Sequence, residues 1–301
     1  MREILAAPGA TRYILEKYGI RARKKYGQNF LIDANVIRNI IDDARITEED
    51  CVLEIGPGIG SMTQLLSEAA GKVICVEIDE SLRPVLAETL EDCDNVRILW
   101  QDILKTDLKA VCNEYGGGKP LKVVANLPYY VTTPILMHLL EQKNVFSSIT
   151  VMVQKEVADR IRSGPGNKEY GALSLAVQYF ALPEAVMTVP PSCFIPRPGV
   201  DSCVLHLKAH EKPPVECSEK VMFALIRAAF NQRRKTLANA VSHGYSLEGR
   251  QFTREEVTAA LEKIGLPPTV RGEALSLEQF AALSLIMGQN TDHNTEEKDD
   301  L

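Results

Sequence analysis

The sequence predicts an α/β protein with a Rossmann-like parallel sheet, followed by a small, entirely helical domain. Two observations lead to this fold class. In residues 1–200, short β-branched runs alternate with longer amphipathic segments, whereas beyond residue 217 only helical patterns remain. Strand–helix alternation is typical of a parallel sheet covered by helices on both faces.

The expected strands are short and rich in valine, isoleucine and leucine. They span residues 52–55, 73–78, 96–100, 122–125, 149–153 and 203–207. The nearly continuous apolar run at 73–76 is typical of a strand buried on both faces of a sheet. Amphipathic segments at 35–44, 62–68 and 134–140 are expected to be helices that pack on this sheet.

The strand–helix pattern ends at residues 208–217, a polar stretch with two consecutive prolines that is typical of a linker. Helical periodicity then follows at 221–241, 253–264 and 277–287. We therefore expect three parts: a sheet domain with a basic N-terminal arm at 1–210, a helical domain at 211–288, and an acidic, disordered tail at 289–301.

Composition excludes several classes of protein. The chain is 45% hydrophobic and 25% charged, as in an ordinary globular protein. It contains no apolar run of about 18 residues that would cross a membrane, and its charged N-terminus lacks the apolar core of a signal peptide. The seven cysteines and five histidines are scattered, so neither a disulfide framework nor a metal site is predicted. These features indicate a cytoplasmic protein without a metal.

Charge is distributed unevenly along the chain, whose net charge is −6. Residues 1–27 contain seven basic and two acidic side chains, and residues 226–240 contain four basic and no acidic ones. The tail at 291–301 is acidic. Polyanions are recognised through local patches and not through total charge. The two basic clusters are compatible with a nucleic-acid partner, although each could equally be a solvated surface.

A glycine-rich turn follows the first expected strand: residues 52–60 read Val-Leu-Glu-Ile-Gly-Pro-Gly-Ile-Gly. Glycines at such a turn let the backbone approach a ligand closely, and the next helix offers its N-terminal amides to polar groups. Ser61 stands where the dinucleotide fingerprint has glycine or alanine. Taken alone, the turn could serve backbone geometry only.

Two acidic residues follow the next two strands. Glu77 ends the second strand and can accept hydrogen bonds from both ribose hydroxyls of a nucleoside. Asp102 follows the third strand and can bind the amine of an adenine. Together with Gly56 and Gly58, these residues follow three successive strands. The sequence therefore predicts an adenosine-containing cofactor, but these residues do not choose between S-adenosylmethionine and a nicotinamide.

The fourth strand ends in Asn126-Leu127-Pro128-Tyr129. The amine of adenine is a poor nucleophile because its lone pair is delocalised into the ring. The Asn126 side-chain oxygen and the Leu127 carbonyl can each accept an amine hydrogen, which favours a pyramidal nitrogen as charge develops. Pro128 stiffens the turn and Tyr129 can stack on the base. Beside an adenosine cofactor this motif favours methyl transfer to adenine, although taken alone it could equally be an ordinary turn.

These motifs resemble those of the ribosomal RNA adenine N6,N6-dimethyltransferases, and most closely those of the small-subunit branch. The resemblance extends over nearly the whole chain. The segments that carry it are 25–33, the glycine turn, Glu77, Asp102, 126–129, 153–160, 194–201 and 229–237. The cofactor it implies is S-adenosyl-L-methionine, bound by Asn29, Leu31, Gly56, Gly58, Glu77, Asp102 and Asn126.

The resemblance also implies the residues that bind the acceptor. The catalytic residues would be Asn126, Leu127, Tyr129 and Phe194, with Phe194 facing Tyr129 across a flipped adenine. RNA phosphates would be held by Arg23, Lys24, Lys25, Lys155, Arg233, Arg234 and Lys235, with an affinity that depends on salt. From the residues alone, Asn29 could instead cap a helix, Phe194 could belong to the core, and Lys155 could lie on a solvated helix.

Members of the small-subunit branch add two methyls to each of two adjacent adenosines near the 3′ end of 16S rRNA. The resemblance implies this reaction, a role in small-subunit biogenesis, and a monomeric enzyme. The large-subunit (23S) branch, which confers macrolide resistance, is an alternative, but residues 126–129 and 231–235 favour the small-subunit branch. A noncatalytic assembly factor and a nicotinamide dehydrogenase are further alternatives. The intact glycine turn with Asn126 disfavours the first, and Ser61 with residues 126–129 disfavours the second.

Overall fold

The computed structural model describes residues 4–20, 27–142, 144–244, 246–247 and 250–296. The chain forms two compact units. The first, here called the sheet unit, comprises residues 1–158 and 181–209, and the second, the helical unit, comprises 159–180 and 210–301. Residues 159–180 were expected in the first domain. They belong instead to the helical unit, because Tyr170, Leu175 and Tyr179 are buried in that unit's core.

The sheet unit contains a seven-stranded sheet in the order β4-β3-β2-β5-β6-β9-β7. Its strands are β2 (Cys51–Ile55), β3 (Lys72–Glu77), β4 (Val96–Trp100), β5 (Leu121–Asn126), β6 (Phe146–Gln154), β7 (Ala181–Val189) and β9 (Ser202–Ala209). β2 to β6 are parallel, which confirms the expected core of the sheet, whereas β9 runs antiparallel to both of its neighbours. β3 and β5 flank β2 on opposite sides, so the order in which strands are added to the sheet reverses beside β2. In open α/β sheets, ligands bind at the carboxyl ends of strands at such a switch point.

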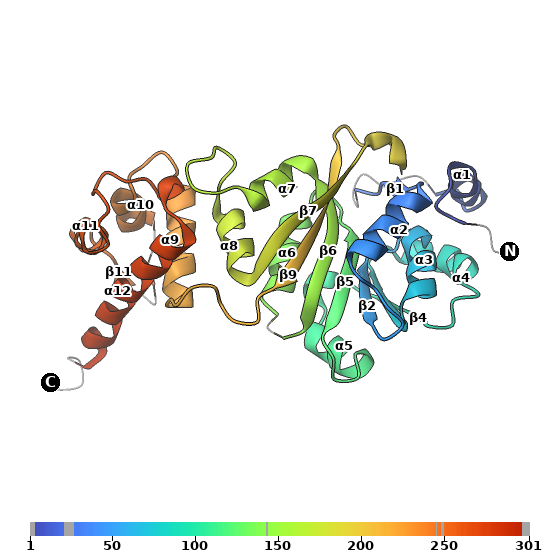
Figure 1. Cartoon of the computed structure of the whole chain (residues 1–301), viewed down its shortest axis with the longest axis horizontal. Helices are drawn as coiled ribbons and strands as arrows, with labels where there is room; N and C mark the ends of the chain where they lie inside the picture. The colour runs from blue at the N-terminus through green and yellow to red at the C-terminus, as the bar shows by residue number, and fades with distance from the viewer. Residues whose placement is uncertain (1–3, 21–26, 143, 245, 248–249, 297–301) are drawn as a thin grey trace. The chain divides into compact units, whose positions relative to one another are not determined.

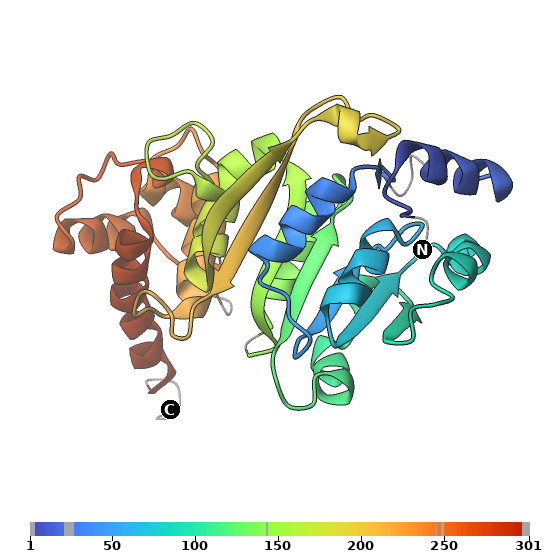
Figure 2. The same ribbon diagram turned by 45° about the vertical axis from the view of Figure 1, so that its right-hand side comes forward.

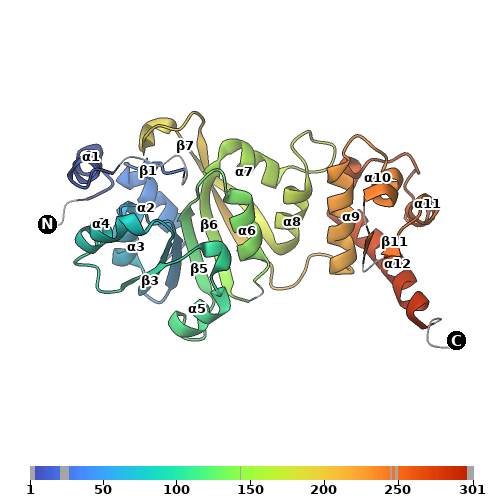
Figure 3. The ribbon, with the colours of Figure 1, turned by 180° about the vertical axis from the view of Figure 1, so that it is seen from behind.

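Helices cover both faces of this sheet. They are α2 (Ala34–Asp43), α3 (Ser61–Ala69), α4 (Arg83–Thr89), α5 (Leu108–Tyr115) and α6 (Thr132–Leu140). α2 lies in front of the sheet in Figure 1, and α6 lies in front of it when the molecule is seen from behind in Figure 3. α2 and α3 are neighbours on the same face (Figure 2). Ile37, Ile40 and Leu66 from these two helices are buried in the core, which fixes the helices on the sheet.

The N-terminal part of the chain packs on the same core. α1 (Pro8–Lys17) buries Ile14, and the preceding Leu5 donates its amide to Gln64 Oε1 on α3 at 3.0 Å. β1 (Phe30–Leu31) pairs with β8 (Phe194–Ile195) in a separate two-stranded ladder. α2 then begins at Asp33, whose side chain caps the helix by accepting the Asn35 amide at 2.9 Å. The β1–β8 ladder and this cap thereby fix the segment between β1 and α2.

The remaining elements of the chain are mostly helical. They are α7 (Lys155–Arg162), which spans the first boundary between the units, α8 (Ala172–Phe180), α9 (Glu219–Asn231), α10 (Leu237–Gly244), α11 (Arg254–Lys263) and α12 (Leu277–Glu296). Short elements complete the chain: β10 (Ser246–Leu247), β11 (Arg250–Gln251) and the 3-10 turns η2 (Glu80–Leu82), η3 (Ile103–Lys105), η4 (Pro191–Cys193) and η5 (Gly272–Ala274).

The helical unit differs from the expectation in three respects. The single helix expected at 221–241 is interrupted at residues 232–236, between α9 and α10. The β10–β11 ladder adds two short strands to a domain that was expected to be all-helical. α12 continues to Glu296, beyond the expected boundary at 288. Within the described part of the chain, no helix has the length and apolarity needed to span a bilayer, and no cluster of three potential metal ligands occurs.

Candidate active site

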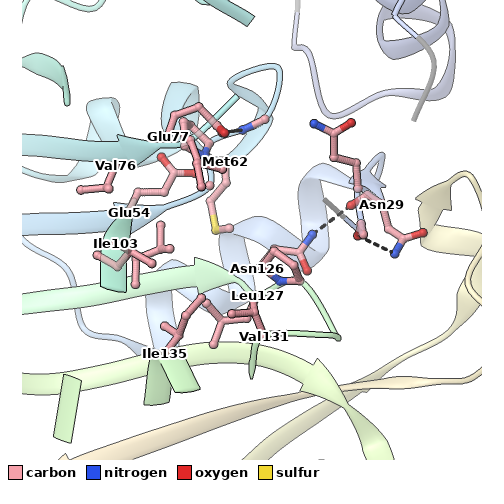
Figure 4. A pocket seen from close by; sticks show the side chains of 18 of the residues that line it. Asn29, Glu54, Met62, Val76, Glu77, Ile103, Asn126, Leu127, Val131 and Ile135 are labelled. Atoms are coloured by element: carbon pink, nitrogen blue, oxygen red, sulfur yellow. Dashed lines mark hydrogen bonds between the residues drawn. The ribbon is translucent and has the colours of Figure 1, made fainter. Parts of the chain in front are cut away.

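One pocket of the sheet unit lies at the carboxyl ends of β2, β3, β4 and β5, and residues 27–31 form part of its wall (Figure 4). Its walls bring together residues that lie far apart in the sequence. They include Asn29, Leu31, Gly56, Gly58, Glu77, Asp102, Asn126, Leu127 and Tyr129. All the residues expected around an adenosine cofactor, and three of the four expected at the acceptor, therefore line one pocket.

The glycine turn shapes one wall of the pocket. Gly56, Gly58 and Gly60 all have positive φ angles, of 69°, 60° and 92°, a backbone region that favours glycine. A Cβ on Gly58 would lie 3.3 Å from the ring of Phe30. Beside the turn, the Oγ of Ser61 is buried in the pocket wall without a hydrogen-bond partner in the described structure. The turn thus offers backbone amides and a buried hydroxyl to a polar ligand.

Glu77 connects this turn to the end of β3. Its side chain is 5% exposed, and its carboxylate accepts hydrogen bonds from the amides of Asp79 at 2.8 Å and Gly58 at 3.4 Å. Burial raises the pKa of Glu77, and these backbone hydrogen bonds oppose the rise. A carboxylate has about four acceptor positions, and the backbone donors do not fill them all, so Glu77 can still accept a hydrogen bond from a ribose.

Asp102 stands at the corresponding position after β4. Its Oδ1 caps η3 by accepting the Leu104 amide at 3.0 Å, which fixes the carboxylate at the pocket wall. Ile78, which is 47% exposed, and the buried Ile103 line the pocket nearby. An acid between apolar side chains suits a purine, whose faces are apolar and whose edge carries an amine.

Asn126 is oriented by the segment that covers the pocket. Its Nδ2 donates to the backbone carbonyl of Asn29 at 3.0 Å, and the Asn29 side chain donates in turn to the carbonyl of Gly27 at 3.2 Å (Figure 4). Because its amide nitrogen is engaged in this way, Asn126 presents its Oδ1 as an acceptor. Asn29 does not cap α2, since Asp33 does so.

The turn after Asn126 is also held firmly. Leu127 donates its amide to the carbonyl of Met152 at 3.1 Å, and Thr132 donates its hydroxyl to the carbonyl of Pro128 at 3.0 Å. The Tyr129 hydroxyl shares a hydrogen bond of 2.7 Å with the Ser202 hydroxyl. Burial raises the pKa of Tyr129, and the hydrogen bond with Ser202 opposes the rise. The turn is a rigid platform with an aromatic ring at the pocket wall.

Phe194 does not reach this pocket, contrary to the role implied by the family resemblance. It is 1% exposed and lies in the buried core with Phe30 and Leu31. Pairing of β8 with β1 sets Phe194 opposite Leu31 and so holds it within the core. Phe194 therefore lies in the core and not among the residues that line the pocket with Tyr129.

Glu54 and Tyr130 are among the pocket residues that were not singled out from the sequence. Glu54 is 1% exposed, and burial, with the charge of Glu77 adding to it, raises its pKa to about 7. Cys75 donates its thiol to Glu54 Oε2 at 3.5 Å. The sequence signal that could have identified Glu54 is an acidic residue within an otherwise apolar strand. Tyr130, the second of these residues, lines the pocket but is 60% exposed.

The residues expected to bind RNA fall into three groups. Arg23, Lys24 and Lys25 lie outside the described residues. Lys155 is exposed at the first position of α7. Arg233 forms an ion pair with Glu273 at 2.6 Å, whereas Arg234 and Lys235 are exposed. The basic cluster after α9 is thus divided between an internally paired arginine and two exposed cations.

A Rossmann-like sheet with this pocket and an Asn-Leu-Pro-Tyr turn defines an S-adenosylmethionine-dependent methyltransferase. The family model for ribosomal RNA adenine dimethylase matches residues 19–273. The chain belongs to this family, and its cofactor is S-adenosylmethionine.

Named relatives and solved structures agree with this assignment. The chain is 54% identical over 287 residues to the ribosomal RNA small subunit methyltransferase A of Lachnoclostridium phytofermentans, covering 95% of this chain and 98% of the relative. The protein of the same name from Alkaliphilus metalliredigens is 49% identical, with coverage of 93% and 96%. A dimethyladenosine transferase from Plasmodium falciparum has a TM-score of 0.70 at 25% identity, covering 87% and 98%. The 23S rRNA methyltransferase ErmE has a TM-score of 0.63 at 25% identity, covering 87% and 100%.

Proposed function

We propose that this protein uses S-adenosylmethionine to dimethylate the N6 amine of two adjacent adenosines near the 3′ end of 16S rRNA, within the small ribosomal subunit. The observation that carries the reaction is the pocket in which Glu77 and Asp102 lie beside the turn of Asn126 and Tyr129. The choice of small-subunit RNA as the substrate is supported by the relatives named small subunit methyltransferase A, which the chain matches over almost its whole length.

The residues of the pocket fit the cofactor. Glu77 would hold the ribose, Asp102 the adenine amine, and the glycine turn the remaining polar groups, with the unpartnered Ser61 hydroxyl among the donors. Asn29 and Leu31 would close the pocket from above. The bound cofactor supplies a methyl group on a positively charged sulfur.

The acceptor amine would be held by the turn after β5. The Oδ1 of Asn126 and the carbonyl of Leu127 accept its two hydrogens and favour a pyramidal nitrogen whose lone pair is available for attack. Tyr129, fixed by its bond to Ser202, stacks on the base and limits its rotation. Correct placement contributes most of the rate, because transfer to an aligned nucleophile needs proximity more than a strong base. The proton that the amine loses passes to solvent.

RNA binding would rest on the exposed cations. Arg234 and Lys235 in the helical unit and Lys155 on α7 are suited to hold phosphates. Double-stranded RNA is recognised largely through its shape and backbone, and unpaired bases are read by stacking, which suits a helical unit combined with a pocket for a single base. We further propose that the enzyme acts as a monomer in the cytoplasm and contributes to small-subunit biogenesis.

Methyl transfer from labelled S-adenosylmethionine would test this proposal. The substrates are small-subunit particles whose adenosines are unmethylated and, for comparison, naked large-subunit RNA. We expect incorporation into the small-subunit particles, with label in two adjacent N6,N6-dimethyladenosines. Incorporation only into large-subunit RNA would instead assign the chain to the activity for which ErmE is named.

A further inference from the structure

The turn 232–236 between α9 and α10 is held by an ion pair within the helical unit. The Nε of Arg233 lies 2.6 Å from Oε2 of Glu273, and its Nη2 donates to the carbonyl of Asn167 at 3.5 Å. The backbone carbonyl of Glu273 accepts the Gly166 amide at 3.0 Å. One arginine therefore connects the turn to two other segments, η5 and the loop before α8.

The backbone on both sides of this ion pair is closely packed. A Cβ on Gly272 would lie 2.4 Å from the Cβ of Ala229, so η5 lies directly against the last turns of α9. The Leu237 amide at the start of α10 donates to the carbonyl of Val270 at 2.8 Å. Arg233 and Glu273 thus face each other from fixed positions, which reduces the entropy lost when the pair forms.

The two basic residues that follow Arg233 differ from it in exposure and in ion pairing. Arg234 and Lys235 are exposed, and neither takes part in an ion pair among the residues that the structure describes. Glu273 is flanked by a second arginine, with Nη1 of Arg271 4.0 Å from its Oε1. Of the three consecutive basic residues, Arg233 is thus the one whose charge is balanced internally.

We propose that Arg233 is a positioning residue, whose pairing with Glu273 holds the turn so that Arg234 and Lys235 meet the phosphates of the RNA. Arg233 itself contacts no phosphate. This inference rests on the proposed function, since it assumes that the helical unit binds RNA. The planar guanidinium suits the role because it donates to Glu273 and Asn167 from different nitrogens at once, which a lysine cannot do in the same geometry.

The direction in which one substitution changes the affinity for RNA separates this positioning role from direct contact with a phosphate. Glu273→Gln removes a negative charge from a basic surface, so electrostatics alone predicts tighter RNA binding. Under our proposal the same substitution releases the turn and weakens binding, by about three- to tenfold at 150 mM KCl, which corresponds to about 0.7 to 1.4 kcal/mol. Glu169→Gln is the matched control, because Glu169 pairs with Lys168 and not with Arg233. We expect this control to leave binding unchanged or to tighten it.

The affinity is to be measured with the full chain by fluorescence anisotropy, using a labelled RNA stem-loop with two adjacent adenosines in its loop. We expect Arg233→Gln, Glu273→Gln and the double variant to weaken binding by similar factors, because all three break the same pair. Arg233→Lys keeps the charge, and we expect it to weaken binding at least about threefold. Tighter binding by Glu273→Gln, or wild-type affinity for Arg233→Lys, would overturn the proposal.

The dependence of affinity on salt counts phosphate contacts, so it separates a residue that binds a phosphate from one that positions the residues that do. Arg234→Gln should reduce the slope of log Kd against log[KCl] by about 0.7 to 0.9, the value for one phosphate contact. The double variant of Arg233 and Glu273 should leave that slope within about 0.3 of wild type, because in the complex the released turn still brings Arg234 and Lys235 to the phosphates and the lost affinity is the cost of ordering it. A loss as large as that of Arg234→Gln would show that Arg233 binds a phosphate.

Two controls separate failure of this inference from other failures. Binding of S-adenosylhomocysteine and the melting temperature establish that each variant is folded. If the wild-type protein neither binds the stem-loop nor methylates small-subunit particles, the proposed function fails. If the wild type does both and Glu273→Gln tightens binding, only the positioning role fails.

Discussion

Replacement of Asn126 by alanine tests the proposed chemistry most closely. The substitution removes the Oδ1 acceptor for the amine and the 3.0 Å bond from Nδ2 to Asn29. Loss of one preorganised group that stabilises developing charge lowers kcat by about 10² to 10³, or about 2.7 to 4 kcal/mol. Loss of the bond to Asn29 adds about 0.5 to 1.5 kcal/mol, which should appear mainly as a raised KM for the cofactor.

Steady-state methyl transfer to small-subunit particles, with kcat and KM measured for both substrates, would check this prediction. Asn126→Asp keeps an acceptor oxygen but loses the donor to Asn29. It should therefore retain a higher kcat than the alanine variant, while binding the cofactor more weakly than wild type. Asn35→Ala, at an exposed position of α2, is the control. If kcat/KM of Asn126→Ala remains within about threefold of wild type, a change below about 0.7 kcal/mol, the proposed mechanism is wrong.

Three further predictions concern the same pocket. Glu77→Gln should weaken cofactor binding by about 10- to 100-fold in calorimetry, because hydrogen bonds to a charged group contribute about 1.5 to 3 kcal/mol; unchanged affinity would exclude ribose binding by Glu77. Burial raises the pKa of Glu54 from its ordinary value of 4.5 to about 7, so the buried side chain disfavours the folded state increasingly as pH rises between these values. Relative to wild type, Glu54→Gln should therefore raise the free energy of unfolding more at pH 8 than at pH 4, by at most about 3.4 kcal/mol. Equal effects at both pH values in chemical denaturation would contradict this. Tyr129→Ala should lower kcat/KM by about 5- to 150-fold through lost stacking. Tyr129→Phe, which loses only the hydrogen bond to Ser202, should lower kcat/KM much less. Equal losses in the two variants would assign the effect to the hydroxyl.

Much of the cofactor site could be predicted from the sequence because parallel strands place their carboxyl ends at one edge of a sheet. Gly56, Glu77, Asp102 and Asn126 each follow a strand that its apolar pattern reveals, and topology alone brings them together. The glycines of the turn were informative for a local reason, since their positive φ angles favour glycine whatever the rest of the chain does.

Features that depend on packing between distant segments could not be predicted in this way. β7 is an edge strand that contains Pro183 and has a mixed pattern of exposure, so its sequence lacks the signal of a buried strand. Phe194 is placed in the core by pairing with Leu31, more than 160 residues earlier in the chain. Arg233 belongs to a basic run in the sequence, but its charge is balanced by Glu273 from a different segment.

Mass spectrometry of ribosomal RNA from cells with and without this protein tests the central claim most directly. We predict two adjacent N6,N6-dimethyladenosines near the 3′ end of 16S rRNA in cells that make the wild-type protein. They should be absent from cells that lack it and strongly reduced in cells that make only Asn126→Ala. Identical 16S rRNA with and without the protein, or a change confined to 23S rRNA, would contradict the account.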